Sequence, residues 1–203
     1  TFLSYSQTFD QKIEDLIDEN LDETIELRHW FHQNAELSNR EFKTAARIAE
    51  ELKKIGYEPK TGIAKTGVVA ILNPGKPGPV VGLRADIDAL PVKERADIPW
   101  ASKMKGVYNG EEVPVMHACG HDMHTAILLA AAKILYDIKD EIPGQVKFIF
   151  QPAEEGAPPG EEGGAELMVK EGVLKNPDVD AIFGLHVWSG LYACLLYTSP
   201  SPR

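Results

Sequence analysis

The segment His117–His124 contains the side chains best suited to chemistry in this sequence. It holds three of the six histidines and one of the two cysteines. Imidazole and thiolate groups bind borderline-soft divalent metals such as zinc, manganese, cobalt or nickel. Cys119 and His121 flank Gly120, whose conformational freedom lets both side chains face one point. These two residues are therefore predicted metal ligands.

Two later segments supply groups that could complete such a site. Glu154 and Glu155 follow the apolar run 145–150, and His186 follows the apolar run 180–185. One carboxylate of the pair can bind metal while the other holds a proton from a metal-bound water. A solvated acidic pair in a turn is the alternative for the two glutamates. Together the ligands and the base indicate metal-assisted hydrolysis.

Two aspartates could support the predicted ligands. Asp86 and Asp88 end the apolar run 80–85. A carboxylate there can orient a histidine ligand by accepting its second N–H. Asp88 could equally well cap a turn or a helix.

The remaining histidines of the chain are assigned supporting roles. His117 and His124 could line the site or serve as supporting or packing groups. His29 and His32 lie beside Trp30 and Phe31 in a helical pattern, so we expect them to be structural. Cys119 and His121 also have an alternative interpretation, as a buried structural cysteine beside a histidine that caps a helix.

The elements that must position these groups follow from periodicity and turn signals. The pattern at 38–41 matches a capping box, and Gly56 is placed to end the helix that this box would open. The two runs around the turn 73–79 are expected to form a hairpin. The predicted helices cover 9–34, 38–56, 125–138 and 162–172, and the predicted strands cover 68–72, 80–85, 145–150 and 180–185.

Strands alternating with helices predict an α/β layered domain with a mostly buried sheet. The candidate carboxylates and His186 all fall at or just past the carboxyl end of a predicted strand. Open α/β sheets bind ligands in the crevice at those ends. The segment 158–164 is interpreted as a loop of the same site.

Composition excludes other classes of protein. Asp and Glu number 31 against 21 Lys and Arg, which gives a formal net charge of −10. So acidic a chain is a poor candidate for binding nucleic acid or an anionic membrane. Its apolar runs are too short to suggest a membrane span, and Cys119 and Cys194 make no disulfide framework.

From residue 20 to 190 the chain resembles the M20 metallopeptidase family. The resemblance is to the branch that includes hippurate hydrolase, N-acyl-amino-acid amidohydrolases and auxin-conjugate hydrolases. Five stretches carry it, in the family's order: 28–38, 82–91, 117–125, 150–156 and 184–187.

The resemblance implies a layered α/β/α metallopeptidase-like catalytic domain that holds two divalent metal ions (zinc, manganese, cobalt or nickel). It implies hydrolysis of the amide bond of a small N-acyl amino acid. The roles that it implies for the matching residues are metal ligand for Cys119, His121, Glu155 and His186, general base for Glu154, and supporting carboxylate for Asp86.

Family members are longer than this chain. They insert a lid or dimerisation domain after the Gly-Leu-His strand and then supply a last histidine ligand. The resemblance thus implies that 9–190 is the first half of the catalytic domain, that this chain alone is inactive or nearly so, and that its parent is a homo-oligomer through the absent domain. A non-catalytic metal-binding domain and a thiol redox protein using Cys119 are the alternatives.

The two ends of the chain carry separate expectations. Residues 1–8 are interpreted as a signal-peptide remnant or a disordered tail, so the protein is either exported or cytoplasmic. Residues 191–203 contain no acidic side chain and no clear period. We expect them to be a non-native tail, with a genuine loop as the alternative.

Overall fold

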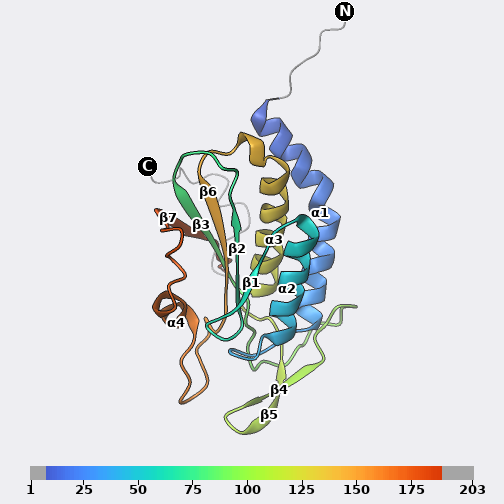
Figure 1. Ribbon diagram of the computed structural model, residues 1–203. Helices are drawn as coiled ribbons and strands as arrows, with labels where there is room; N and C mark the ends of the chain where they lie inside the picture. The colour runs from blue at the N-terminus through green and yellow to red at the C-terminus, as the bar shows by residue number, and fades with distance from the viewer. Residues whose placement is uncertain (1–7, 189–203) are drawn as a thin grey trace, which may run out of the picture.

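The computed structural model describes residues 8–188 (Figure 1). The expectations for 1–7 and for 191–203 lie outside these residues. In chain order the described elements are α1 (Phe9–Gln33), α2 (Phe42–Ile55), β1 (Lys60–Ile63), β2 (Gly67–Leu72), β3 (Val80–Asp86), β4 (Met104–Tyr108), β5 (Glu111–Val115), α3 (His121–Asp137), the 3-10 helix η1 (Lys139–Glu141), β6 (Gln145–Gln151), α4 (Gly164–Lys170) and β7 (Ala181–Gly184).

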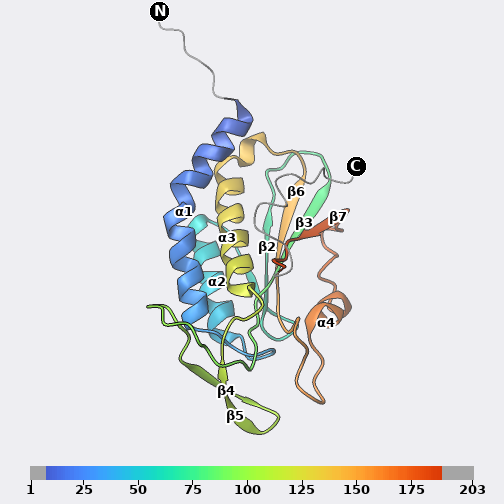
Figure 2. The same ribbon diagram turned by 180° about the vertical axis from the view of Figure 1, so that it is seen from behind.

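A five-stranded sheet separates two layers of helices, as the alternation of elements predicted. Its strand order is β1-β2-β6-β3-β7. Figures 1 and 2 show α1, α2 and α3 together on one side of this sheet and α4 on the other. Strands β3, β6 and β7 are mutually parallel, so their carboxyl ends meet at one edge. The candidate residues that follow these three strands are therefore brought to the same place.

The predicted hairpin between 68–72 and 80–85 is wrong. β6 lies between the two strands, antiparallel to β2 and parallel to β3. The physical reason is that the side chains on both faces of β6 are buried, and a central position in the sheet gives that cover. The seven-residue turn 73–79 is long enough to pass over one intervening strand.

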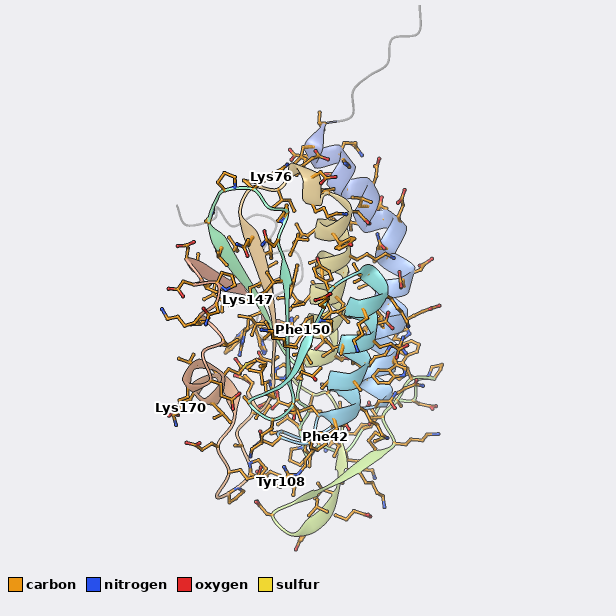
Figure 3. The ribbon with its side chains drawn as sticks, viewed as in Figure 1. Phe42, Lys76, Tyr108, Lys147, Phe150 and Lys170 are labelled. Atoms are coloured by element: carbon orange, nitrogen blue, oxygen red, sulfur yellow. The ribbon has the colours of Figure 1, made fainter. Side chains whose placement is uncertain are left out.

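Alternation along β6 divides the core between the two layers. Phe148 and Phe150 are fully buried against α2 and α3, while Ile149 packs on the other face with Met168 and Val173. Figure 3 shows Phe150 in the layer between the sheet and the helices. Each such side chain contributes roughly 1.5–3 kcal/mol through burial. The sheet is thus held rigidly where it carries the site.

Two helix starts differ from the sequence predictions. Ser38 does not cap α2: its hydroxyl donates to Asp88 Oδ2 at 2.7 Å, and the Glu36 carboxylate accepts the N–H groups of Lys43 and Thr44 in the first turn of α2 instead. Gly56 ends α2 in the left-handed conformation, as predicted. α3 begins at His121, four residues earlier than expected, because Gly120 starts it with φ +88°.

β1 and the β4–β5 hairpin were not predicted from the sequence. Asn109 and Gly110 join β4 to β5, and both have positive φ. An Asn-Gly pair is the strongest short-range hairpin signal, so this element could have been found. Figure 1 shows the hairpin projecting beyond the edge at which β3 and β6 end. Within residues 8–188, no helix combines the length and apolarity needed to cross a membrane.

Candidate metal centre

Gly120 lets the cysteine–histidine turn pack closely against the segment after β7. A Cβ at this position would lie 2.6 Å from Val187 Cγ2, and φ is +88°. Both the space and the backbone conformation therefore require glycine. The close approach places Cys119 Sγ 3.4 Å from His186 Nε2, although 67 positions separate the two residues.

Backbone carbonyls orient both histidines toward the same point. His121 Nδ1 donates to the Asp88 carbonyl oxygen at 2.9 Å, and His186 Nδ1 donates to the Val187 carbonyl oxygen at 2.6 Å. A carbonyl oxygen can only accept, so in the neutral form of each ring the second nitrogen, Nε2, is the one without a proton. This arrangement fixes the tautomer in the way that metal-binding histidines require.

Two groups of three residues bring ligand atoms within 4.8 Å of one another. Cys119, His121 and His186 form one group, and Asp86, His121 and Glu154 form the other. His121 belongs to both, so the two groups adjoin. His121 Nε2 lies 3.8 Å from Glu154 Oε2, and the Glu154 side chain is 39% exposed while His121 is fully buried. Glu154 thus lies at the open side of the centre.

Asp86 and Asp88 differ in environment. Asp86 is buried beside Arg84, and burial raises the pKa of Asp86 to about 6 against the opposing effect of that guanidinium. Asp88 is equally buried, but hydrogen bonds from His121, Ser38 and the Glu155 backbone outweigh the effect of burial and hold its pKa below the usual range. Asp88 Oδ1 lies 3.3 Å from His121 Nδ1. Hence the side chain of Asp88, and not that of Asp86, lies against Nδ1 of His121.

Glu155 lies beside Cys119 but outside both groups of three. Burial, followed by a hydrogen bond to the Glu155 carboxylate, raises the pKa of the Cys119 thiol to about 12. A bound cation reverses this preference, since a coordinating thiol is deprotonated outright. The Glu155 carboxylate is therefore adjacent to the centre.

The other two histidines of the cluster are held differently. His124 Nε2 accepts the Val187 N–H at 3.1 Å, which ties α3 to the segment carrying His186. Burial lowers the pKa of His124 to about 4, so it accepts in the neutral form. His117 is completely buried, its pKa is also lowered to about 4 by burial, and neither ring nitrogen has a partner among the described residues.

The two histidines of α1 make structural contacts. His29 stacks on Trp100 with ring centroids 3.8 Å apart. His32 lies between two carboxylates, with Nδ1 2.9 Å from Asp122 Oδ2 and Nε2 2.8 Å from Glu94 Oε2. Neither histidine belongs to a candidate ligand group.

The residues of the centre fit divalent metal ions. His121 Nε2 is buried and has no hydrogen-bond partner within the described part of the chain, a costly state unless another group meets it. A thiol, two imidazoles and carboxylates are the donor set of zinc and similar borderline ions. The geometry therefore favours a metal centre over a solvated acidic turn.

Comparison with known proteins decides the family. The model of peptidase family M20/M25/M40 matches residues 82–194, more than half of the chain. The chain belongs to this family. The M20 match covers Asp86, Asp88 and every residue of the two groups described above.

Characterised M20 relatives align over most of this chain. An N-acyl-L-amino acid amidohydrolase of Geobacillus stearothermophilus is 44% identical over 89% of the chain and 45% of its own length. A hippurate hydrolase of Campylobacter jejuni is 44% identical over 84% of the chain and 42% of its own length. This chain thus spans less than half the length of these relatives.

A solved structure supports the fold. The Bacillus subtilis YXEP protein, described as a dinuclear metal-binding peptidase of family M20, superposes with a TM-score of 0.73 at 39% identity. The match covers 84% of this chain and 44% of that one. The layered α/β domain expected from the sequence is therefore the M20 catalytic fold.

Proposed function

We propose that the protein to which these residues belong is a metal-dependent hydrolase that cleaves the amide bond of N-acyl amino acids. One observation carries the proposal: Cys119, His121 and His186 meet at one sheet edge, with the exposed carboxylate of Glu154 3.8 Å from His121. The amidohydrolase names of relatives that are 44% identical support the substrate class.

The proposed ligands are Cys119, His121, Glu155 and His186, and they would hold two divalent ions together with residues outside this segment. When bound, such ions lower the pKa of a coordinated water toward neutrality and polarise the scissile carbonyl. Asp88 keeps the Nδ1–H of His121 in place, so that Nε2 remains the coordinating atom. Asp86 adds a buried carboxylate behind this ligand.

Glu154 is the proposed general base. Its side chain is exposed at the open side of the centre, where water and substrate have access. There the carboxylate accepts a proton from the attacking water and later returns it to the leaving amine. The neighbouring Glu155 carboxylate faces Cys119 instead, so we assign it the role of a metal ligand and not that of a base.

A small cavity beside Glu155 supports a substrate with an apolar part. Its volume is about 140 Å³, and it lies between the β4–β5 hairpin and the loop at 155–159. Leu37, Leu90, Pro158 and Pro159 form its apolar part, and Ser38, Arg40 and Asn109 also line it. We propose that it receives an apolar group of the acylated amino acid.

The substitution Glu154→Gln tests the proposed chemistry. In the protein that contains these residues, we expect kcat for N-acetyl or N-benzoyl amino acids to fall by about 10²–10⁴-fold, because the proton acceptor is lost. Metal content, measured by elemental analysis, should not change. The exposed Glu112→Gln variant on the hairpin is the control and should behave as wild type.

Turnover that survives Glu154→Gln would contradict the assignment of the base. Stoichiometric metal without any turnover in the wild-type protein would favour a non-catalytic metal-binding domain instead.

A further inference from the structure

Glu41 is a completely buried carboxylate whose two hydrogen bonds reach distant parts of the chain. Its Oε1 accepts the Ala153 N–H at 2.9 Å, and its Oε2 accepts the Thr66 hydroxyl at 2.6 Å. Neither donor is a cation. Burial raises the pKa of Glu41 to about 7 despite both bonds. A carboxylate kept in so costly a place calls for an explanation beyond helix capping.

The Ala153 turn is the segment that these contacts control. Ala153 has φ +50°, an unfavourable conformation for a residue with a side chain, and it is buried. Its carbonyl oxygen is closely packed, because a Cβ on Gly164 would lie 2.9 Å from it. Glu154 and Glu155 follow at once, so the turn determines where both carboxylates point.

Two buried carboxylates hold consecutive parts of this turn. Glu41 accepts the N–H of Ala153, and Asp88 Oδ2 accepts the N–H of Glu155 at 3.0 Å. The Asp88 side chain also lies against His121, so one end of the turn is already tied to the metal centre. Glu41 supplies the second attachment, from the start of α2.

We propose that Glu41 is a positioning residue of the metal centre, which holds the left-handed Ala153 turn so that Glu154 and Glu155 face the cluster. The inference rests on the proposed function. Without an acceptor, the buried Ala153 N–H would be unpaired, and no hydrogen bond would offset the strain of the left-handed backbone at Ala153. The turn would then relax, and both glutamates would move away from their positions.

Three variants separate the hydrogen bond to Ala153 from the charge and from the fold. Glu41→Met keeps the length of the side chain but removes both acceptors. Glu41→Gln keeps an oxygen for the Ala153 N–H and offers its N–H to the Thr66 hydroxyl. Thr66→Val removes only the other contact and is the matched control.

Three quantities are measured for each variant. They are the rate of amide hydrogen exchange in the peptide 151–156, the affinity for Co²⁺, and the visible spectrum of the bound Co²⁺. Glu41→Met should exchange faster in this peptide, bind Co²⁺ about 10–100-fold more weakly and show an altered spectrum. Glu41→Gln and Thr66→Val should stay close to wild type in all three. Circular dichroism checks that each variant is folded.

The proposal is overturned if Glu41→Met leaves exchange and Co²⁺ binding unchanged, or if exchange rises while Co²⁺ affinity stays the same. Equal losses in the Gln and Met variants would also overturn it, because charge would then matter and not the acceptor. If Glu41→Met does not fold, Glu41→Asp replaces it, since the shorter carboxylate cannot reach both partners. Wild-type protein that binds no Co²⁺ would instead refute the proposed function and, with it, the inference.

Discussion

At the scale of single residues, the Asp88 carboxylate connects the parts of the metal centre. One oxygen lies 3.3 Å from His121 Nδ1, and the other accepts from Ser38 and from the Glu155 backbone. The sequence placed Asp86 and Asp88 at the same strand end, and the family resemblance gave the supporting role to Asp86, whereas Asp88 is the one that lies against His121 Nδ1. The choice depends on which carboxylate faces α3 after β3 has ended, and a strand pattern alone does not contain that information.

The substitution Asp88→Asn tests this connection. The amide keeps an acceptor but loses the charge that holds the Nδ1–H of His121, so we expect metal affinity to fall about 10–100-fold. Titration with Zn²⁺ in competition with a chelator measures the change. Asp180→Asn is the matched control, because Asp180 also accepts a backbone N–H, at the opposite end of β3. An unchanged affinity in Asp88→Asn would show that the backbone carbonyl of Asp88 orients His121 by itself.

The residue types of the site, Gly120 and the Asp86–Asp88 pair could be recognised in the sequence, but Glu41 could not. Cysteine, histidine and paired glutamates can be recognised because few other functions explain their spacing. Glu41 gave no such signal: the contact with Ala153 joins residues 112 positions apart. Moreover, its surroundings look like an ordinary capping box, and the structure shows instead that Ser38 and Glu41 both point toward the site.

At the scale of elements, the sheet order could not be predicted from local pattern. Short turns usually join paired strands, and 73–79 was assigned on that basis. β6 enters between β2 and β3 because burial on both faces outweighs the local preference. The one polar residue inside this strand, Lys147, is buried and donates to the carbonyl oxygens of Val173, Lys175 and Pro177 at 2.9–3.0 Å, where Figure 3 labels it on the sheet.

The ion-pair network around His32 joins α1 to α3 and makes a pH-dependent contribution to stability. A hydrogen bond with Asp122, then that with Glu94, raises the pKa of His32 above its ordinary value of 6.5. A raised pKa means that the contribution is fully present below about 6.5 and is lost as pH rises through the folded-state pKa. The carboxylates of Asp122 and Glu94 have lowered pKa values, so they stay charged in this range.

We therefore expect His32→Gln to lower the free energy of unfolding by about 1.5–3 kcal/mol at pH 6, because the buried Asp122 carboxylate loses one charged partner and keeps only Arg28. At pH 9 the difference from wild type should be smaller, since the wild-type imidazole is then neutral. Urea unfolding at the two pH values measures this. His29→Gln, at a histidine outside the network, is the control. A difference that grows with pH would contradict the assignment.

At the scale of the whole molecule, β7 is the edge strand of the sheet within the described residues 8–188. Ile182, Phe183 and Leu185 are between 50% and 69% exposed, and Trp188 is 70% exposed. Exposed apolar edge strands promote association between chains, which the net charge of −10 opposes.

We expect this chain to self-associate through the β7 edge. Phe183→Lys should shift sedimentation velocity profiles at micromolar concentrations toward the monomer, because it places a charge on the apolar surface. Val107→Lys is a matched control, since Val107 is 70% exposed on the β4–β5 hairpin and away from the edge. Equal effects of the two substitutions would show that net charge, and not the edge, controls association.

The central claim is that Cys119, His121 and His186 assemble a metal centre, and metal content tests it most directly. Elemental analysis of the purified protein that contains these residues should find one or two transition-metal ions per molecule in the wild type and in the His29→Ala control. Cys119→Ala should lose most of this metal, because it removes the thiolate from the cluster. The absence of metal from that wild-type protein, or full retention by Cys119→Ala, would contradict the account.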